Sequence, residues 1–288
     1  MRLFYLQNES GERLALNNET GIFLTEPEGL GLEFSDTFAD INEGFFKMVS
    51  KRYSQNEISA KINFIKDSYS TYYKFIDWCV KASKLYFIYK PLAEEYYAHV
   101  ELASIEKNEI NKVGYLECPV KFKYLSPWFL PKPVKIELIG AGVSAFRWDS
   151  SILDGTDVFI STTSEQYEAD ISAFGQLPAG IIINFNGVSV NPEFKLIGKT
   201  TGKIYGHCKI TGNFGLGSSI ELSTLYEDSY IKSINVLGVE SDLINSIDLT
   251  KDPFFKIPLN EECTLKILDS GSLHGNASVK IYHYYRSV

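Results

Sequence analysis

Turn-forming residues interrupt the apolar segments of this chain at short intervals. From Val134 onward, segments such as GIIINFNGVSV, EFKLIG and SYIKSINVLG are bounded by Gly, Asn, Asp or Pro. Short runs rich in Val, Ile and Phe between such residues are typical of β-strands joined by tight turns. This half of the sequence has no segment with the apolar spacing of a helix. It therefore predicts a β-sandwich or jelly roll built from many short strands.

The length and the prolines together predict two domains. A chain of 288 residues is near the size at which a single core divides. Pro127, Pro131 and Pro133 lie close together in SPWFLPKPV, where they remove backbone donors and stiffen the chain. We place the boundary there, with one domain over residues 1–130 and a second over residues 131–288.

The first half predicts a β-rich domain with one long hairpin. Aromatic residues make up 14% of the chain and mostly stand beside Val, Ile and Thr, a combination that favours strands. The runs GLGLEFSDTFADI and FFKMVSKRYSQNEISAKINFI flank a turn signal at Asn42–Gly44. Because these arms are longer than a compact domain requires, we expect the end around Phe38–Val49 to extend outside the core.

One segment, Ser68–Ser83, has helical periodicity. Asp67 or Ser68 can cap its N-terminus. Such an aromatic stripe packs a helix against a sheet more often than it lines a ligand pocket, so we assign it to the core. The residues of the stripe are Tyr72, Phe75, Ile76, Cys79 and Val80.

Charge and cysteine spacing exclude several functional classes. The net charge of −8 and the pI of about 5.2 argue against a protein that holds nucleic acid, because phosphate binding depends on Lys and Arg. The cysteines are scattered singly, without the spacing of a metal site, and we predict that they are reduced and mostly buried. They are Cys79, Cys118, Cys208 and Cys263.

The N-terminal segment MRLFYLQNESGERL lacks the apolar core and the cleavage site of a signal peptide. No apolar run in the sequence approaches the length of a membrane span. We therefore expect synthesis in the cytosol and no membrane partner.

Two glycine-rich segments are similar to nucleotide-binding loops, but neither has the required context. In KIELIGAGVSA, the residues Gly140, Gly142 and Ala145 follow a strand, yet the next segment predicts turns instead of a phosphate-binding helix. The segment GNFGLGS, Gly212–Ser218, lacks a closing lysine and predicts a β-turn. The histidines share no sequence neighbourhood, and no nucleophile motif is present. We predict no catalytic residue, no cofactor and no metal.

Several passages form a distinctive combination when taken in order, although each is weak alone. In the first half they are LFYLQNESGERLALN, TGIFLTEPEGLGLEF, YYKFIDWCVKASKLYFIYKP and LECPVKFKYLSPWF; in the second half they are INFNGVSVNPEFKL and IDLTKDPFFKIPLNEECTLKI. In this combination the chain resembles the distal tail proteins of siphophages and related tail-like particles. The resemblance covers most of the chain and is most specific up to about Pro133.

The resemblance implies a mainly β fold. It implies an N-terminal ring-forming domain related to tail-tube subunits, with a β sandwich, one flanking helix and an extended hairpin, and a C-terminal galectin-like β sandwich at the periphery. Proteins of this family typically form a hexameric ring that joins the tail tube protein to the tail-associated baseplate hub protein. Receptor-binding or adaptor proteins are often attached to that ring. We therefore predict a non-enzymatic structural protein of the virion tail, assembled in the bacterial host cytoplasm.

The long hairpin is the candidate subunit interface, because exposed hairpins and sheet edges can pair across subunits. The candidate residues are Phe38, Ile41, Phe45, Phe46 and Met48. An acidic chain also suits a conduit, since carboxylates facing the lumen would repel DNA phosphates. Genomic DNA would then pass through without specific binding.

The alternative function is a cell-wall carbohydrate-binding module of the tail tip. Aromatic side chains can stack on sugar rings, and Trp148 and Tyr167 are the candidates in the second domain. Most aromatic residues of a β sandwich fill its core, however, so burial is the favoured interpretation of both. A tail-tip enzyme has the least support, because no catalytic constellation has the right context.

Overall fold

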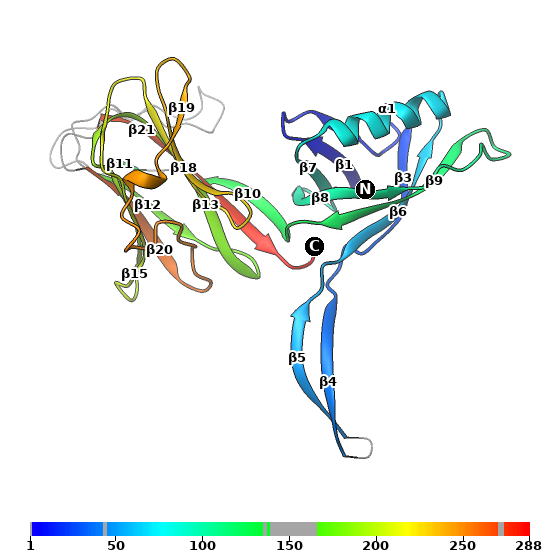
Figure 1. Ribbon diagram of the computed structural model, residues 1–288, viewed down its shortest axis with the longest axis horizontal. Helices are drawn as coiled ribbons and strands as arrows, with labels where there is room; N and C mark the ends of the chain where they lie inside the picture. The colour runs from blue at the N-terminus through cyan, green and yellow to red at the C-terminus, as the bar shows by residue number, and fades with distance from the viewer. Residues whose placement is uncertain (1, 43–44, 135–136, 139–165, 270–273) are drawn as a thin grey trace. The chain divides into compact units, whose positions relative to one another are not determined.

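The computed structural model in Figure 1 describes residues 2–42, 45–134, 137–138, 166–269 and 274–288. The chain divides into two units, Met1–Leu130 with Tyr285–Val288, and Pro131–Tyr284. The sequence-based boundary assigns all of residues 131–288 to the second domain, whereas the last four residues group with the first unit. They belong to the first unit because Tyr285 and Val288 pack on its core, where the ring of Tyr285 meets that of Tyr96 edge-on at 5.4 Å.

The first unit is an antiparallel sheet in the order β2-β1-β7-β8-β9-β6-β3. Hydrogen bonding continues from the end of β2 into β3, because the Leu24 amide donates to the Leu16 carbonyl and Asn17 bridges Phe23. The two ends of the sheet are thereby joined, and the sheet closes around its core. Its strands are β1 (Leu3–Asn8), β2 (Arg13–Ala15), β3 (Ile22–Glu28), β6 (Glu57–Phe64), β7 (Leu85–Lys90), β8 (Tyr96–Ile105) and β9 (Leu116–Tyr124).

Helix α1 (Ser68–Lys81) packs on this sheet, as its periodicity predicts. Tyr72 and Phe75 are buried, and both rings lie 5.7 Å from the ring of Phe64 on β6. Val80, the last member of the predicted stripe, is 73% exposed, because the buried side of the last turn is taken by its neighbour Cys79 and Val80 points away from the core.

Neither predicted capping residue closes the start of α1 with its side chain. Asp67 adopts a left-handed conformation with φ of 44° and makes no side-chain capping bond. The Ser68 hydroxyl donates instead to the Phe64 carbonyl at 2.7 Å. The capping prediction was therefore wrong, because the turn that follows β6 takes the Ser68 hydroxyl back toward the strand.

The strands β4 (Phe34–Asn42) and β5 (Phe45–Tyr53) form a separate two-stranded sheet. Figure 1 shows this hairpin extending from the closed sheet of its own unit. Two bulges interrupt its register, one where Thr37 is followed by Phe38 and one between Asp40 and Asn42. Within the described part of the chain, neither strand pairs with any other strand.

The second unit is a two-sheet structure without an α-helix in its described residues. One sheet has the order β11-β12-β20-β14-β15, and the other contains β19-β18-β17-β13-β21, with β16 also paired to β13. The strands of the first sheet are β11 (Glu137–Leu138), β12 (Gln166–Ser172), β14 (Glu193–Gly198), β15 (Ile204–Lys209) and β20 (Glu262–Leu268). Those of the second are β13 (Leu177–Val190), β16 (Asn213–Phe214), β17 (Ser219–Thr224), β18 (Ser229–Ile234), β19 (Glu240–Asp242) and β21 (His274–Tyr285). Strand β10 (Trp128–Val134) spans the unit boundary, and the 3₁₀ turn η1 covers Ile244–Ser246.

The core of the second unit lies between these sheets. Ile181 and Phe185 on β13 belong to the same buried cluster as Phe194 on β14 and Leu265 on β20. Alternating burial along β14 and β20 produces this cluster, since successive side chains of a strand point to opposite faces. No helix in the described residues is long and apolar enough to cross a membrane.

Gly206 on β15 is required by this packing. A Cβ atom at this position would lie 2.0 Å from the Cβ atom of Phe255, which is itself 1% exposed. We expect Gly206→Ala to lower the free energy of unfolding of the second unit by about 1–3 kcal/mol, the usual cost of overpacking. Chemical denaturation measures the effect. Gly215→Ala is the matched control, because no atom lies within 4 Å of its added Cβ, and an equal loss in both variants would contradict this account.

Candidate assembly surfaces

The hairpin exposes all the apolar residues that the sequence assigns to a subunit interface. Their exposed fractions range from 47% for Met48 to 72% for Phe45. The others are Phe38, Ile41 and Phe46, and the structure adds Phe34 and Val49 to this exposed set. Sequence reasoning omitted Phe34 because it lies at the foot of β4, outside the end that was expected to project.

The register of β4 and β5 gathers several of these side chains on one face. Phe38 pairs with Met48, and two residues further along β4 Asp40 pairs with Phe46. Alternate residues of a strand share a face, so Phe34 lies on this face as well. Asp36 and Asp40 also lie on this face. Soluble monomers rarely leave several large apolar side chains together in water, which makes this face a candidate contact surface.

The opposite face of the hairpin carries small and basic side chains. It carries Arg52 opposite Ser35 and Lys47 opposite Ala39. No hydrogen bond or ion pair within the described residues involves the side chain of Lys47 or Arg52. The third cation of β5, Lys51, lies with its Nζ atom 3.9 Å from the centre of the Phe34 ring on the apolar face.

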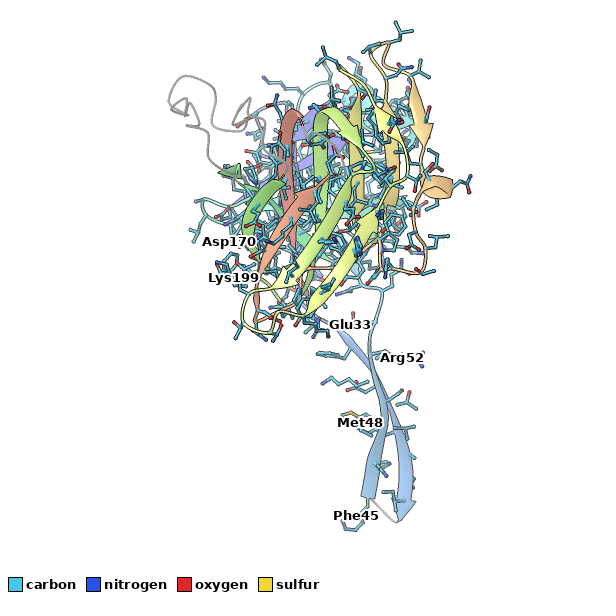
Figure 2. The ribbon with its side chains drawn as sticks, turned by 90° about the vertical axis from the view of Figure 1, so that its left-hand side faces the viewer. Glu33, Phe45, Met48, Arg52, Asp170 and Lys199 are labelled. Carbon is cyan, nitrogen blue, oxygen red and sulfur yellow. The ribbon has the colours of Figure 1, made fainter. Side chains whose placement is uncertain are left out.

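An open hollow lies at the foot of the hairpin. It has a volume of about 490 Å³ and a mainly polar lining. Its lining residues are Glu28, Gly29, Gly31, Leu32, Glu33, Asn56, Glu57 and Ser59. Figure 2 shows Glu33 at the foot of the hairpin, with Met48 partway along it and Phe45 at its far end.

Close backbone contacts fix the shape of this hollow. Gly29 has a φ of 79°, and a Cβ atom there would lie 1.9 Å from the Glu57 carbonyl oxygen. The Tyr124 hydroxyl donates to the Gly29 carbonyl at 3.0 Å, and Lys121 pairs with the Glu57 carboxylate at 2.7 Å. The carboxylates of Glu28 and Glu33 have no such partner among the described residues.

The second unit presents a face of paired charges on its five-stranded sheet. Lys199 contacts Asp170 at 2.6 Å and Glu262 at 3.2 Å, and Figure 2 shows Asp170 beside Lys199. Glu168 pairs with Lys266 across β12 and β20. Each of these charges therefore already has a partner on this face.

Glu193 is the centre of a second charge cluster on the same sheet. Burial alone would raise the pKa of its carboxyl group, but hydrogen bonds from Lys195 and Lys209 outweigh that effect and lower the pKa to about 2. The Nε2 atom of His207 lies 3.2 Å from the same carboxylate.

Exposed aliphatic side chains meet on two turns of the second unit. Leu216 is 83% exposed on the turn between β16 and β17, and Val236 and Leu237 are exposed on the turn between β18 and β19. The turns touch, since a Cβ atom on Gly217 would lie 2.6 Å from a methyl carbon of Val236.

Of the two glycan-contact candidates, only Tyr167 is among the described residues. Tyr167 is 2% exposed, its hydroxyl donates to the Gly275 carbonyl at 2.5 Å, and its ring packs on Phe185. It is therefore a core residue and cannot stack on a sugar. Trp148 lies outside the described residues, as do Gly140, Gly142 and Ala145 of the glycine-rich segment.

The remaining sequence predictions concern glycines and cysteines. Gly212–Ser218 forms β16 and a turn, as predicted. The cysteines are all free and buried, and burial raises the pKa of the Cys79 and Cys208 thiols to about 12. Within the described residues, no group of His, Cys, Asp and Glu side chains is arranged to hold a metal ion.

Residues 3–125 match the family model of the distal tail protein N-terminal domain. The first unit therefore contains the N-terminal domain of a phage distal tail protein. This family is one of structural phage tail proteins and not of enzymes, which places the chain in the virion tail. A search of curated proteins found no match to this distal tail protein.

Solved structures share the fold of this distal tail protein over its whole length. A chain of the phage p2 baseplate, in its activated conformation with Ca, has a TM-score of 0.72 and 14% identity, and the match covers 100% of both chains. The same baseplate with Sr gives a TM-score of 0.71 and 15% identity, again over 100% of both chains. The Dit protein of phage SPP1, described as a paradigm of the hub adsorption apparatus in phages that infect Gram-positive bacteria, gives 0.59 and 8% identity over 97% of this chain and 98% of that one.

The Glu193 cluster predicts a pH-dependent contribution to the stability of the second unit. The folded-state pKa is depressed, so this stabilisation is present above the unfolded pKa of about 4.3 and is lost as the pH falls toward 2. We expect Glu193→Gln to lower the midpoint of thermal unfolding at pH 7, with a difference from the wild type that shrinks between about pH 4 and pH 2. Glu240→Gln, which removes an exposed partner of Lys232, is the control. A Glu193→Gln difference that stayed constant across this pH range would rule out the ion-pair explanation.

Proposed function

We propose that this distal tail protein assembles into a hexameric ring that joins the tail tube to the baseplate. The observation that carries the proposal is the hairpin, whose apolar face is exposed in the single chain and has no core of its own to enter. An isolated two-stranded sheet is at best marginally stable in water, so packing against another subunit would supply the contacts that it lacks. The tail tube protein and the tail-associated baseplate hub protein are the proposed axial partners.

The ring also serves, in this proposal, as an attachment platform for receptor-binding or adaptor proteins. The second unit is the proposed peripheral, galectin-like part, and the fold match to a chain of the phage p2 baseplate supports a place in such an assembly. Its exposed aliphatic turns provide an apolar surface for protein contacts. The charged sheet face is less suited to such contacts, because its ion pairs would have to be desolvated.

The acidic composition supports passage of DNA through this ring. A net charge of −8 per chain would give a hexameric channel wall that repels phosphates at short range. Genomic DNA would then cross the ring without being held by it.

The ring interface is tested by removing the apolar face of the hairpin. We expect Phe38→Ser combined with Phe46→Ser to convert wild-type rings into smaller species, because both side chains lie on that face. Sedimentation velocity and negative-stain imaging measure the change, and circular dichroism checks that the chain still folds. Val80→Ser with Leu92→Ser is the matched control, since these residues of the same unit are even more exposed than Phe38 and Phe46. Rings that persist in the hairpin variant would show that this face is not the interface.

A further inference from the structure

The hairpin and the hollow at its foot carry opposite charges that no described residue of the chain pairs. Lys47 and Arg52 lie on the small, basic face of β5. The hollow presents the carboxylates of Glu28 and Glu33, and both side chains are exposed. None of these four groups has a hydrogen-bond or ion-pair partner within the described residues.

The chain cannot bring its own hairpin tip into its own hollow. The hollow is lined by Glu33, which directly precedes β4, and by Asn56, which follows β5. The hairpin therefore leaves from the rim of the hollow, and Figure 2 shows its far end, at Phe45, well separated from Glu33. Lys47 lies two residues from Phe45, so it could reach the hollow only if the β4–β5 pairing were broken.

We propose that the basic face of β5 binds in the acidic hollow of a neighbouring copy of this chain. The occupant is a second copy because Lys47, near the far end of the hairpin, and the carboxylates of the hollow are opposite charges on separate surfaces, and neither has a partner within the described residues. The small residues Ser35 and Ala39, opposite Arg52 and Lys47, allow a close approach of this face. The apolar face of the same hairpin remains free for a separate contact.

This contact joins two different surfaces, so it repeats head to tail. A heterologous contact of this kind closes into a ring when the rotation between copies allows it. The inference rests on the proposed ring and specifies which surface of the neighbour the hairpin recognises.

Charge reversal on each surface separately tests the contact. One variant carries Lys47→Glu and Arg52→Glu, and the other carries Glu28→Lys and Glu33→Lys. Each variant alone then places like charges at every contact, which opposes association. We expect each alone to need at least about tenfold more protein for half-assembly, as measured by mass photometry and sedimentation.

Mixing the two variants provides the decisive comparison. In the mixture, the acidic β5 of one variant meets the basic hollow of the other, and the unreversed β5 meets the unreversed hollow. We expect alternating rings to form from equal amounts of both, with each variant in every second position. If the separate variants fail to assemble and the mixture also fails, the proposed contact is wrong.

Further outcomes separate this contact from the ring itself. Lys74→Glu with Lys112→Glu, at exposed positions of the same unit, controls for the change in net charge and should assemble as the wild type does. If the wild type forms rings and both reversed variants do so equally well, the ring stands but the charge contact is overturned. If the wild type forms no ring under any condition, the proposed function fails together with this contact.

Discussion

Among the described residues, no core covers the apolar face of the β4–β5 hairpin. The proposed assembly depends on this exposed face. Two strands make one layer, and a layer buries an apolar face only against something else. In the closed sheet of the first unit and in the two-sheet second unit, that requirement is met within the chain. In the hairpin it is not, although Phe38 and Phe46 lie on the same exposed face. In the proposed assembly, another subunit would cover this face.

The remainder of the first unit holds the hairpin at a defined root. Closure of the sheet between Leu16 and Leu24 fixes β3, and the close approach of Gly29 to the Glu57 carbonyl fixes where β3 ends and β6 begins. The hairpin leaves the sheet between these two strands, so their packing fixes its root. A rigid root limits the entropy that is lost when the hairpin docks on another subunit, which favours specific over promiscuous association.

The sequence predicts those features that arise from local patterns. Alternating apolar residues and turn signals identify the strands, and the spacing of Tyr72, Phe75 and Cys79 identifies the helix, because both patterns follow directly from backbone periodicity. The exposed hairpin was likewise predictable from arms too long for a compact core.

Features that join distant segments were not predictable from the sequence. The hollow combines the end of β3 with the start of β6, and the burial of Tyr167 depends on Gly275, far along the chain. The prediction that Asp67 or Ser68 caps the helix was wrong, because the Ser68 hydroxyl bonds to the preceding strand and not to the helix.

In the proposed assembly, a neighbouring subunit covers the hairpin. Hydrogen–deuterium exchange of the backbone amides in β4 and β5 measures this most directly, with the assembled protein compared with the dissociated chain. We expect the backbone amides of Phe34–Tyr53 to exchange slowly in the assembly, and those at the far end of the hairpin to exchange fast in the free chain. The amides of the closed sheet should be protected in both states. Equally fast exchange of the hairpin in both states would contradict the proposed assembly.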